Sequence, residues 1–225
     1  MGLSNASSGI NILQEELKIE KTTAEDRIVA LGGNPNVGKS TVFNSPTGLN
    51  QHTGNWPGKT VTNAYGSYKY KGRNFILVDI PGTYSLMANS VDEEVARDFI
   101  CFGEPHTTVI VVDATCLERN LNLVLQTLEI TSNVILCVNL MDEAKRKNIH
   151  INLKKLSHEL GIPVVGTSAV KAIGLSNLME EIYNISYGRF KLSPMSIRYS
   201  EEIEKAISMI ENKVRAINQS KLSSR

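Results

Sequence analysis

The sequence predicts an α/β domain in which a mainly parallel, six-stranded sheet is covered by helices on both faces. Short apolar runs alternate with segments of helical spacing along most of the chain. Such alternation is typical of parallel strands joined by crossover helices. One exception occurs where only Lys71-Gly72 separates two strand-like runs, at 65–70 and 75–78. We expect these two strands to form an antiparallel hairpin.

The predicted elements follow one another in a regular order. The other predicted strands are 28–31, 109–112, 134–138 and 162–165. A first helix begins near Gly38, and further helices are predicted over about 91–102, 119–130, 153–160 and 175–187. We expect a flexible leader over 1–26, with a short amphipathic segment at 12–19, and one domain over 27–187. The rest, 188–225, reads as a linker and the start of a helical region. Apolar residues at helical spacing predict a C-terminal helix over about 199–218.

The composition sets limits on the partners of this chain. The net charge of the 225 residues is +1, so no strong field attracts it to nucleic acid or anionic lipid. Apolar runs reach about five residues, whereas a membrane helix needs about 20. Three unpatterned cysteines suggest a reducing compartment, and the histidines and cysteines lack metal-ligand spacing. We expect a cytoplasmic, soluble chain that binds no nucleic acid.

A phosphate-binding loop follows the first predicted strand. The segment GNPNVGKS, residues 33–40, matches GxxxxGK[ST] and opens a predicted helix. Glycines let successive backbone N–H groups point inward at an anion, while the lysine supplies charge for phosphates and the serine a hydroxyl for magnesium. The residues expected to bind nucleotide here are Gly33, Asn34, Asn36, Val37, Gly38, Lys39, Ser40 and Thr41.

Asp79-Ile80-Pro81-Gly82 ends the strand at 75–78. A carboxylate at the carboxyl end of a strand is well placed to hold magnesium through a water. Gly82 lets its backbone N–H approach a γ-phosphate. Thr83 stands where Ras carries its water-orienting glutamine, and no arginine finger is evident in the chain. We therefore expect slow intrinsic hydrolysis, with Lys39, Gly82 and Thr83 at the reacting phosphate.

Two further motifs predict a guanine site. Asn139-Leu140-Met141-Asp142 follows a strand, and the Asp142 carboxylate can accept both N1–H and the exocyclic amine of guanine, a donor pair that adenine lacks. Met141 belongs to the same motif. Thr167-Ser168-Ala169 follows the last strand, and the backbone N–H groups of Ser168 and Ala169 suit the guanine O6. The four motifs in this order predict a Ras-like P-loop GTPase that binds GTP or GDP with Mg²⁺.

Several longer segments resemble one family, the cytosolic domain of the bacterial ferrous iron transport protein FeoB. They are GNPNVGKSTVFN (33–44), TGLNQHTGNWPGKTV (47–61), DIPGTYSL (79–86), VARDF (95–99) and DATCLERNLN (113–122). The resemblance implies that Thr60 is the switch threonine that binds magnesium with GTP. It also implies that Asn36 helps to hold K⁺ beside the phosphates. The residues alone leave open whether Asn36 is only a turn-forming residue.

Three departures from the family pattern stand out. Ser45-Pro46 replaces an expected Ala-Leu, and a proline there predicts a helix that stops early or kinks. About 28 residues follow the linker, too few for the helical GDI-like domain that follows in this family. The membrane-embedded part is absent, so we interpret the chain as a fragment of a larger transporter.

These observations support three hypotheses about function. The first is a GTP-hydrolysing domain at the inner face of the bacterial cell membrane, where it partners the membrane-embedded part of its transporter and couples nucleotide state to Fe(II) uptake. The second is a soluble potassium-dependent GTPase for tRNA modification or ribosome assembly. The third is a module that binds nucleotide without hydrolysis. Trp56 reads as a packing anchor or a nucleotide-stacking residue, and the oligomeric state stays open.

Overall fold

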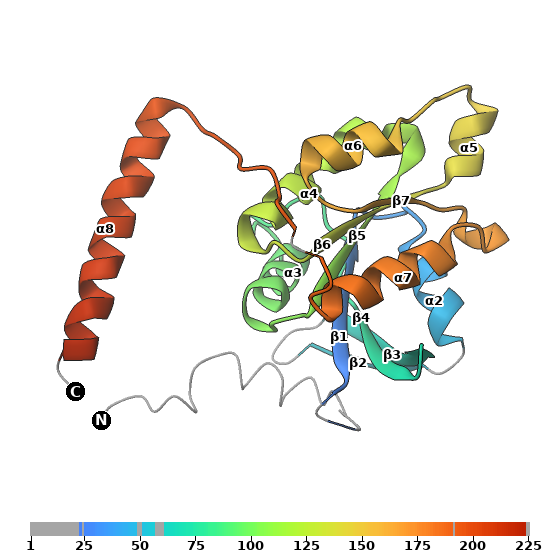
Figure 1. Ribbon diagram of the computed structural model, residues 1–225, viewed down its shortest axis with the longest axis horizontal. Coiled ribbons are helices and arrows are strands. Elements are labelled where there is room, and N and C mark those ends of the chain that lie inside the picture. The colour runs from blue at the N-terminus through green and yellow to red at the C-terminus, as the bar shows by residue number, and fades with distance from the viewer. Residues whose placement is uncertain (1–22, 24, 49–50, 57–60, 191, 224–225) are drawn as a thin grey trace. The chain divides into compact units, whose positions relative to one another are not determined.

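Seven strands form one sheet in the part of the chain that the structure describes. This structure is a computed structural model, and it describes residues 23, 25–48, 51–56, 61–190 and 192–223. The sheet order is β2-β3-β4-β1-β5-β6-β7 (Figure 1). The strands are β1 Arg27–Gly33, β2 Gln51–Asn55, β3 Thr62–Tyr70, β4 Arg73–Asp79, β5 Thr107–Asp113, β6 Val134–Asn139 and β7 Val164–Gly166.

The pairing of the strands confirms a mainly parallel sheet. β1 pairs in parallel with β4 and β5, and β5, β6 and β7 continue the parallel order. β3 and β4 form the predicted antiparallel hairpin around Lys71-Gly72. All six predicted strands are present, and β2 adds a seventh, antiparallel to β3 at the edge of the sheet. Its sequence, QHTGN, has neither alternation nor an apolar run to predict a strand.

Helices cover both faces of the sheet, as the sequence predicts (Figure 1). One core contains buried residues of α3 (Val91–Phe102), α4 (Leu117–Ile130) and α6 (Leu153–Leu160). The opposite core contains those of α2 (Lys39–Thr47) and α7 (Leu175–Ser186). β1 shows the reason, because Ile28 and Ala30 belong to the first core and Val29 and Leu31 to the second. Alternate side chains of a strand point to opposite faces.

Pro46 does not end the first helix. Helix α2 continues through Pro46 to Thr47, which corrects the expectation of an early stop. The Thr47 hydroxyl donates to the Phe43 carbonyl at 2.7 Å, and the Gly48 N–H donates to the Asn44 carbonyl at 2.9 Å. Because Pro46 lies in the last turn, its missing N–H removes one hydrogen bond only, and the bonds around it close the helix.

The C-terminal residues form a second compact unit, from Ser196 onward, whereas the first unit ends at Met195. The second unit contains helix α8, Glu201–Ser223, at the place where the sequence predicts a helix. Its apolar residues Ile203, Ile207, Ile210 and Val214 are between 42% and 62% exposed. The predicted leader over 1–26, with its amphipathic segment at 12–19, lies almost wholly outside the described residues. None of the described helices combines the length and apolar character needed to cross a membrane.

Candidate nucleotide site

The loop between β1 and α2 has a backbone that its glycines make possible. Gly38 has a φ of 81°, and a Cβ there would lie 2.5 Å from the Asn139 side-chain nitrogen. A Cβ on Gly33 would lie 2.4 Å from the Val111 carbonyl oxygen. Both positions therefore exclude a side chain. Asn36 has a φ of 65°, a left-handed conformation that asparagine adopts more readily than most residues.

The lysine and the acid predicted to act on phosphate and metal meet at this loop. Lys39 forms an ion pair with Asp79 and donates to the Ile80 carbonyl at 2.8 Å. Burial raises the pKa of the Asp79 carboxyl, and the Lys39 ammonium offsets part of that rise. An ammonium and a carboxylate thus lie together where β1 and β4 end. The donor set suits a polyphosphate with a hard divalent cation, since the ammonium can bind the phosphate and the carboxylate the cation.

The loop after Asp79 lies against the phosphate loop. The Thr83 N–H donates to the Gly33 carbonyl at 3.1 Å, and a Cβ on Gly82 would lie 3.5 Å from Pro35. The Thr83 hydroxyl donates to the Ser85 carbonyl at 2.6 Å and accepts from the Ser85 N–H at 3.1 Å. In this structure Thr83 is buried, and its hydroxyl closes a turn with Ser85.

Asn139 joins the phosphate loop to the predicted base site. Its side-chain N–H donates to the Val37 carbonyl at 3.0 Å. Its Oδ1 accepts from the Thr167 hydroxyl at 3.0 Å and from the Ala169 N–H at 3.1 Å. The side chain is 1% exposed. Three of the four motifs are therefore held by one buried amide, whose hydrogen-bonding groups are satisfied as a buried group requires.

The Asp142 carboxylate stands beside Ser168 and Lys171. The Asp142 N–H donates to the Ser168 hydroxyl oxygen at 3.1 Å, and Lys171 Nζ lies 2.9 Å from Asp142 Oδ2. The hydrogen bond from Lys171 lowers the pKa of the Asp142 carboxyl. An ionised carboxylate at this place can accept two donors from one edge of a base. Leu140, with a φ of 62°, precedes helix α5 (Met141–Arg146).

The structure brings most of the predicted site residues to one edge of the sheet, at the carboxyl ends of β1, β4, β6 and β7. Two predicted donors already have partners. The Ser168 N–H donates to the Ile173 carbonyl at 3.1 Å, and the Ala169 N–H is bonded to Asn139. Thr60 lies outside the described residues. Trp56 is buried and packs edge-on against Phe99, with ring centroids 5.3 Å apart.

Sequence reasoning missed two contributions to this site. Lys171 lies in the short 3₁₀ helix Ala169–Lys171, and no pattern marks it as the partner of Asp142. The bond from the Thr167 hydroxyl to Asn139 joins two motifs 28 residues apart. A threonine in a loop after a strand was the only signal for it.

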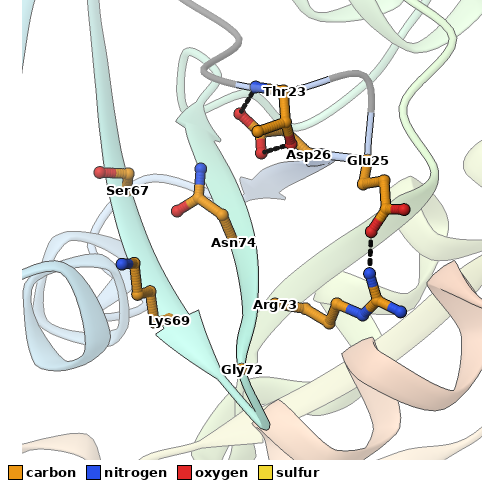
Figure 2. Close-up of a pocket in the computed structure, with 8 residues that line it drawn as sticks. All are labelled: Thr23, Glu25, Asp26, Ser67, Lys69, Gly72, Arg73 and Asn74. Carbon is orange, nitrogen blue, oxygen red and sulfur yellow. Dashed lines mark hydrogen bonds and ion pairs between the residues drawn. The ribbon is translucent and has the colours of Figure 1, made fainter.

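A separate depression of about 430 Å³ lies at the opposite end of β1 (Figure 2). The turn before β1 and the β3–β4 hairpin line it. Its two carboxylates are engaged, because Asp26 accepts from the Thr23 hydroxyl at 2.8 Å and Glu25 pairs with Arg73. Among the described residues, no group of three or more His, Cys, Asp or Glu side chains is arranged to hold a metal.

The fold and the meeting of four motifs at one sheet edge define a Ras-like P-loop GTPase domain. A family model described as ferrous iron transport protein B matches residues 27–182. The chain belongs to this family, and corresponds to the N-terminal G domain of its members.

Relatives and solved structures agree with this assignment. The Fe(2+) transporter FeoB of Methanocaldococcus jannaschii is 57% identical over 101 residues, which cover 45% of this chain and 15% of that protein. The G domain of the T. maritima FeoB iron transporter is 43% identical, with a TM-score of 0.68, and covers 72% of this chain and 99% of that one. The T. maritima FeoB cytosolic domain in a GDP form is 40% identical, with a TM-score of 0.79. The match covers 84% of this chain and 75% of that one. The chain thus spans less than a fifth of the M. jannaschii transporter.

Proposed function

We propose that this chain binds GTP and GDP with Mg²⁺, hydrolyses GTP slowly, and couples its nucleotide state to Fe(II) uptake by a membrane transporter. The observation that carries the proposal is the meeting of Lys39 and Asp79 beside an amide, Asn139, that ties the phosphate loop to the base site. A related domain has been solved in a GDP form. Membership of the family removes the basis for a soluble GTPase of tRNA modification.

Each group at the site has a proposed task. Backbone N–H groups of residues 33, 34 and 36–41 and the Lys39 ammonium bind phosphates. Ser40, Asp79 and Thr60 bind Mg²⁺, which neutralises phosphate charge. The Lys39–Asp79 ion pair must separate when nucleotide and Mg²⁺ bind. Lys39 then pairs with a phosphate in place of Asp79, and Asp79 with Mg²⁺ in place of Lys39. Asp142 recognises guanine, with Asn139, Met141, Ser168 and Ala169 shaping its surroundings.

The proposed slow rate is supported by the residue that follows Gly82. Thr83 stands where Ras carries its water-orienting glutamine, and in this structure its hydroxyl is bonded to Ser85. Ras without its activator turns over at about 3–5 × 10⁻⁴ s⁻¹, and we expect this domain within roughly two decades of that rate. Asn36 is proposed to hold K⁺, which would supply part of the positive charge that an arginine finger supplies elsewhere.

The remaining assignments concern the longer protein. The relatives are named as Fe(2+) transporters, and this chain matches a minor part of their length. We infer that residues 27–187 are the GTPase domain, at the cytoplasmic face of the membrane. Residues 188–225 are inferred to be a linker and the start of a helical region, with the exposed apolar residues of α8 packing on later segments.

The test measures binding of a fluorescent GDP and phosphate release from GTP, with Mg²⁺, for the parent and for Lys39→Ala. The parent should bind the nucleotide and release phosphate slowly, and Lys39→Ala should lose most binding. Equal binding by Lys39→Ala would contradict the phosphate site, and many turnovers per second in sodium buffer would contradict the slow rate. For coupling, Lys39→Ala in the full-length transporter should reduce Fe(II) uptake at unchanged protein level. Undiminished uptake would refute coupling.

A further inference from the structure

Asn34 is a buried amide at the nucleotide site. It is the second residue of the phosphate loop and is 2% exposed, and among the residues that the structure describes neither its Oδ1 nor its Nδ2 has a hydrogen-bond partner. Asn139 is buried as deeply in the same site and has three hydrogen bonds. Buried polar side-chain atoms are nearly always paired, and leaving them without partners costs free energy. We therefore expect a state of the protein in which the Asn34 side chain has hydrogen-bond partners.

The backbone on either side of Asn34 contacts the loop that follows β4. The carbonyl of Gly33 accepts from the Thr83 N–H at 3.1 Å. On the other side, a Cβ on Gly82 would lie 3.5 Å from Pro35. The loop over 79–83 thus crosses the phosphate loop at Asn34. It carries Asp79, the proposed magnesium ligand, and Gly82, whose N–H we assign to the γ-phosphate. If the Gly82 N–H donates to the γ-phosphate, this loop has a contact with GTP that GDP cannot offer, because GDP lacks that phosphate.

We propose that Asn34 is a positioning residue whose side-chain amide hydrogen-bonds to the backbone of the 79–83 loop when GTP is bound. Backbone N–H and C=O groups of that loop are the partners its donor and acceptor fit. The amide has no partner in the arrangement described here, and pairing with the 79–83 loop would favour the GTP-bound arrangement. Only such a difference between two states can shift an equilibrium between them. The inference rests on the proposed GTP binding and deepens it.

Asn34→Leu tests this with little change of side-chain volume, and Asn34→Ala serves as a second variant. Asn120→Leu is the matched control. Asn120 is also 2% exposed, but its Oδ1 accepts from the Asp113 N–H at 2.8 Å. For each protein we would measure the Tm without nucleotide, the affinities for GDP and for a non-hydrolysable GTP analogue, and the rate of GTP hydrolysis.

Removing an amide that has no partner in this structure should leave the Tm of Asn34→Leu, measured without nucleotide, at or above that of the parent. Asn120→Leu should lower it, because the Asp113 N–H loses its acceptor. The affinity of Asn34→Leu for the GTP analogue should fall on the order of tenfold more than its affinity for GDP. That factor corresponds to about 1.4 kcal/mol of hydrogen bonding. Hydrolysis should slow as well.

Three outcomes would overturn the inference. If both Asn34 variants lowered the nucleotide-free Tm and weakened GDP and the GTP analogue equally, Asn34 would be a structural residue, paired with an internal water. If the parent bound neither nucleotide, the proposed function itself would fail, and this inference with it. If the parent bound both nucleotides but the Asn34 variants showed no selective loss of affinity for the GTP analogue, only the proposed role of Asn34 would be contradicted.

Discussion

The Lys171 ammonium lies 2.9 Å from the carboxylate of Asp142, the group that we assign to guanine recognition. Lys171 is 57% exposed at its side chain and Asp142 25%. A base that donates to Asp142 must share this carboxylate with Lys171 or displace it. Lys171 therefore competes with the ligand, although ion pairs exposed to water contribute little free energy.

Replacing Lys171 with alanine should strengthen GDP binding by no more than about fivefold, since ion pairs exposed to water contribute little free energy. Lys171→Arg keeps the cation and should bind like the parent. The pH dependence gives a second readout. Guanine needs the ionised carboxylate, so binding is lost as the pH falls through the pKa of Asp142. Lys171 lowers that pKa, and its removal should shift the loss to higher pH. Weaker GDP binding by Lys171→Ala would show that the lysine supports the base site.

Asp142→Asn should lower GTP affinity on the order of tenfold to a hundredfold, because a hydrogen bond to a charged group contributes about 1.5–3 kcal/mol. Asparagine both donates and accepts, and xanthine has an acceptor where guanine has its amine. Affinity for xanthosine triphosphate should therefore rise. Titration of both nucleotides against parent and variant checks this exchange. Unchanged GTP affinity would show that the base lies elsewhere.

Potassium should accelerate GTP hydrolysis relative to sodium at equal ionic strength. We propose that Asn36 offers a neutral oxygen beside the phosphates, although its φ of 65° also suits a plain turn residue. Alanine would add strain at that φ, whereas glycine adopts it freely. Asn36→Gly therefore removes the amide oxygen and keeps the turn, and it should abolish most of the potassium effect with GTP binding largely retained. Asn36→Ala should do the same at lower stability. Phosphate release in matched salts gives the answer, and equal parent rates in both salts would leave Asn36 as a turn residue.

Pro46→Leu should raise the stability of the domain. Pro46 lines a narrow apolar cavity between α2 and α7, together with Val42, Leu178 and Tyr68, whose buried hydroxyl has no hydrogen-bond partner among the described residues. Leucine restores a backbone donor and adds apolar volume. Each buried CH₂ contributes about 0.8 kcal/mol, and a net gain of about 1 kcal/mol corresponds to a Tm increase of roughly 2–4 °C.

Pro46→Ala is the control for that experiment, because alanine restores the N–H without filling the cavity. Thermal unfolding of the three proteins separates the two contributions. We expect the Tm to be highest for the leucine variant, lower for the alanine variant and lowest for the parent with Pro46. A leucine variant less stable than the alanine variant would mean that the side chain does not fit between α2 and α7.

Local patterns alone determined the class of fold and the order of the elements. The alternating cores on the two faces of β1 and the hairpin at Lys71-Gly72 follow from side-chain periodicity and turn chemistry, which act over a few residues. The phosphate and base motifs could be recognised in the sequence because each needs particular residues at fixed spacing at the end of a strand. Strand β2 could not be predicted from the sequence, because it is extended through its pairing with β3 and its own residues carry no strand pattern.

Contacts between distant segments were decided only by the tertiary structure. The sheet order sets β6 beside β5 and β7, so that Asn139 reaches Val37, 102 residues away, and Thr167. For the same reason Lys171 meets Asp142, and Asn34 is buried with no hydrogen-bond partner in the part of the chain that the structure describes. Hydrogen bonds and burial at such sites depend on which strand ends the fold brings together, and no spacing along the chain encodes that.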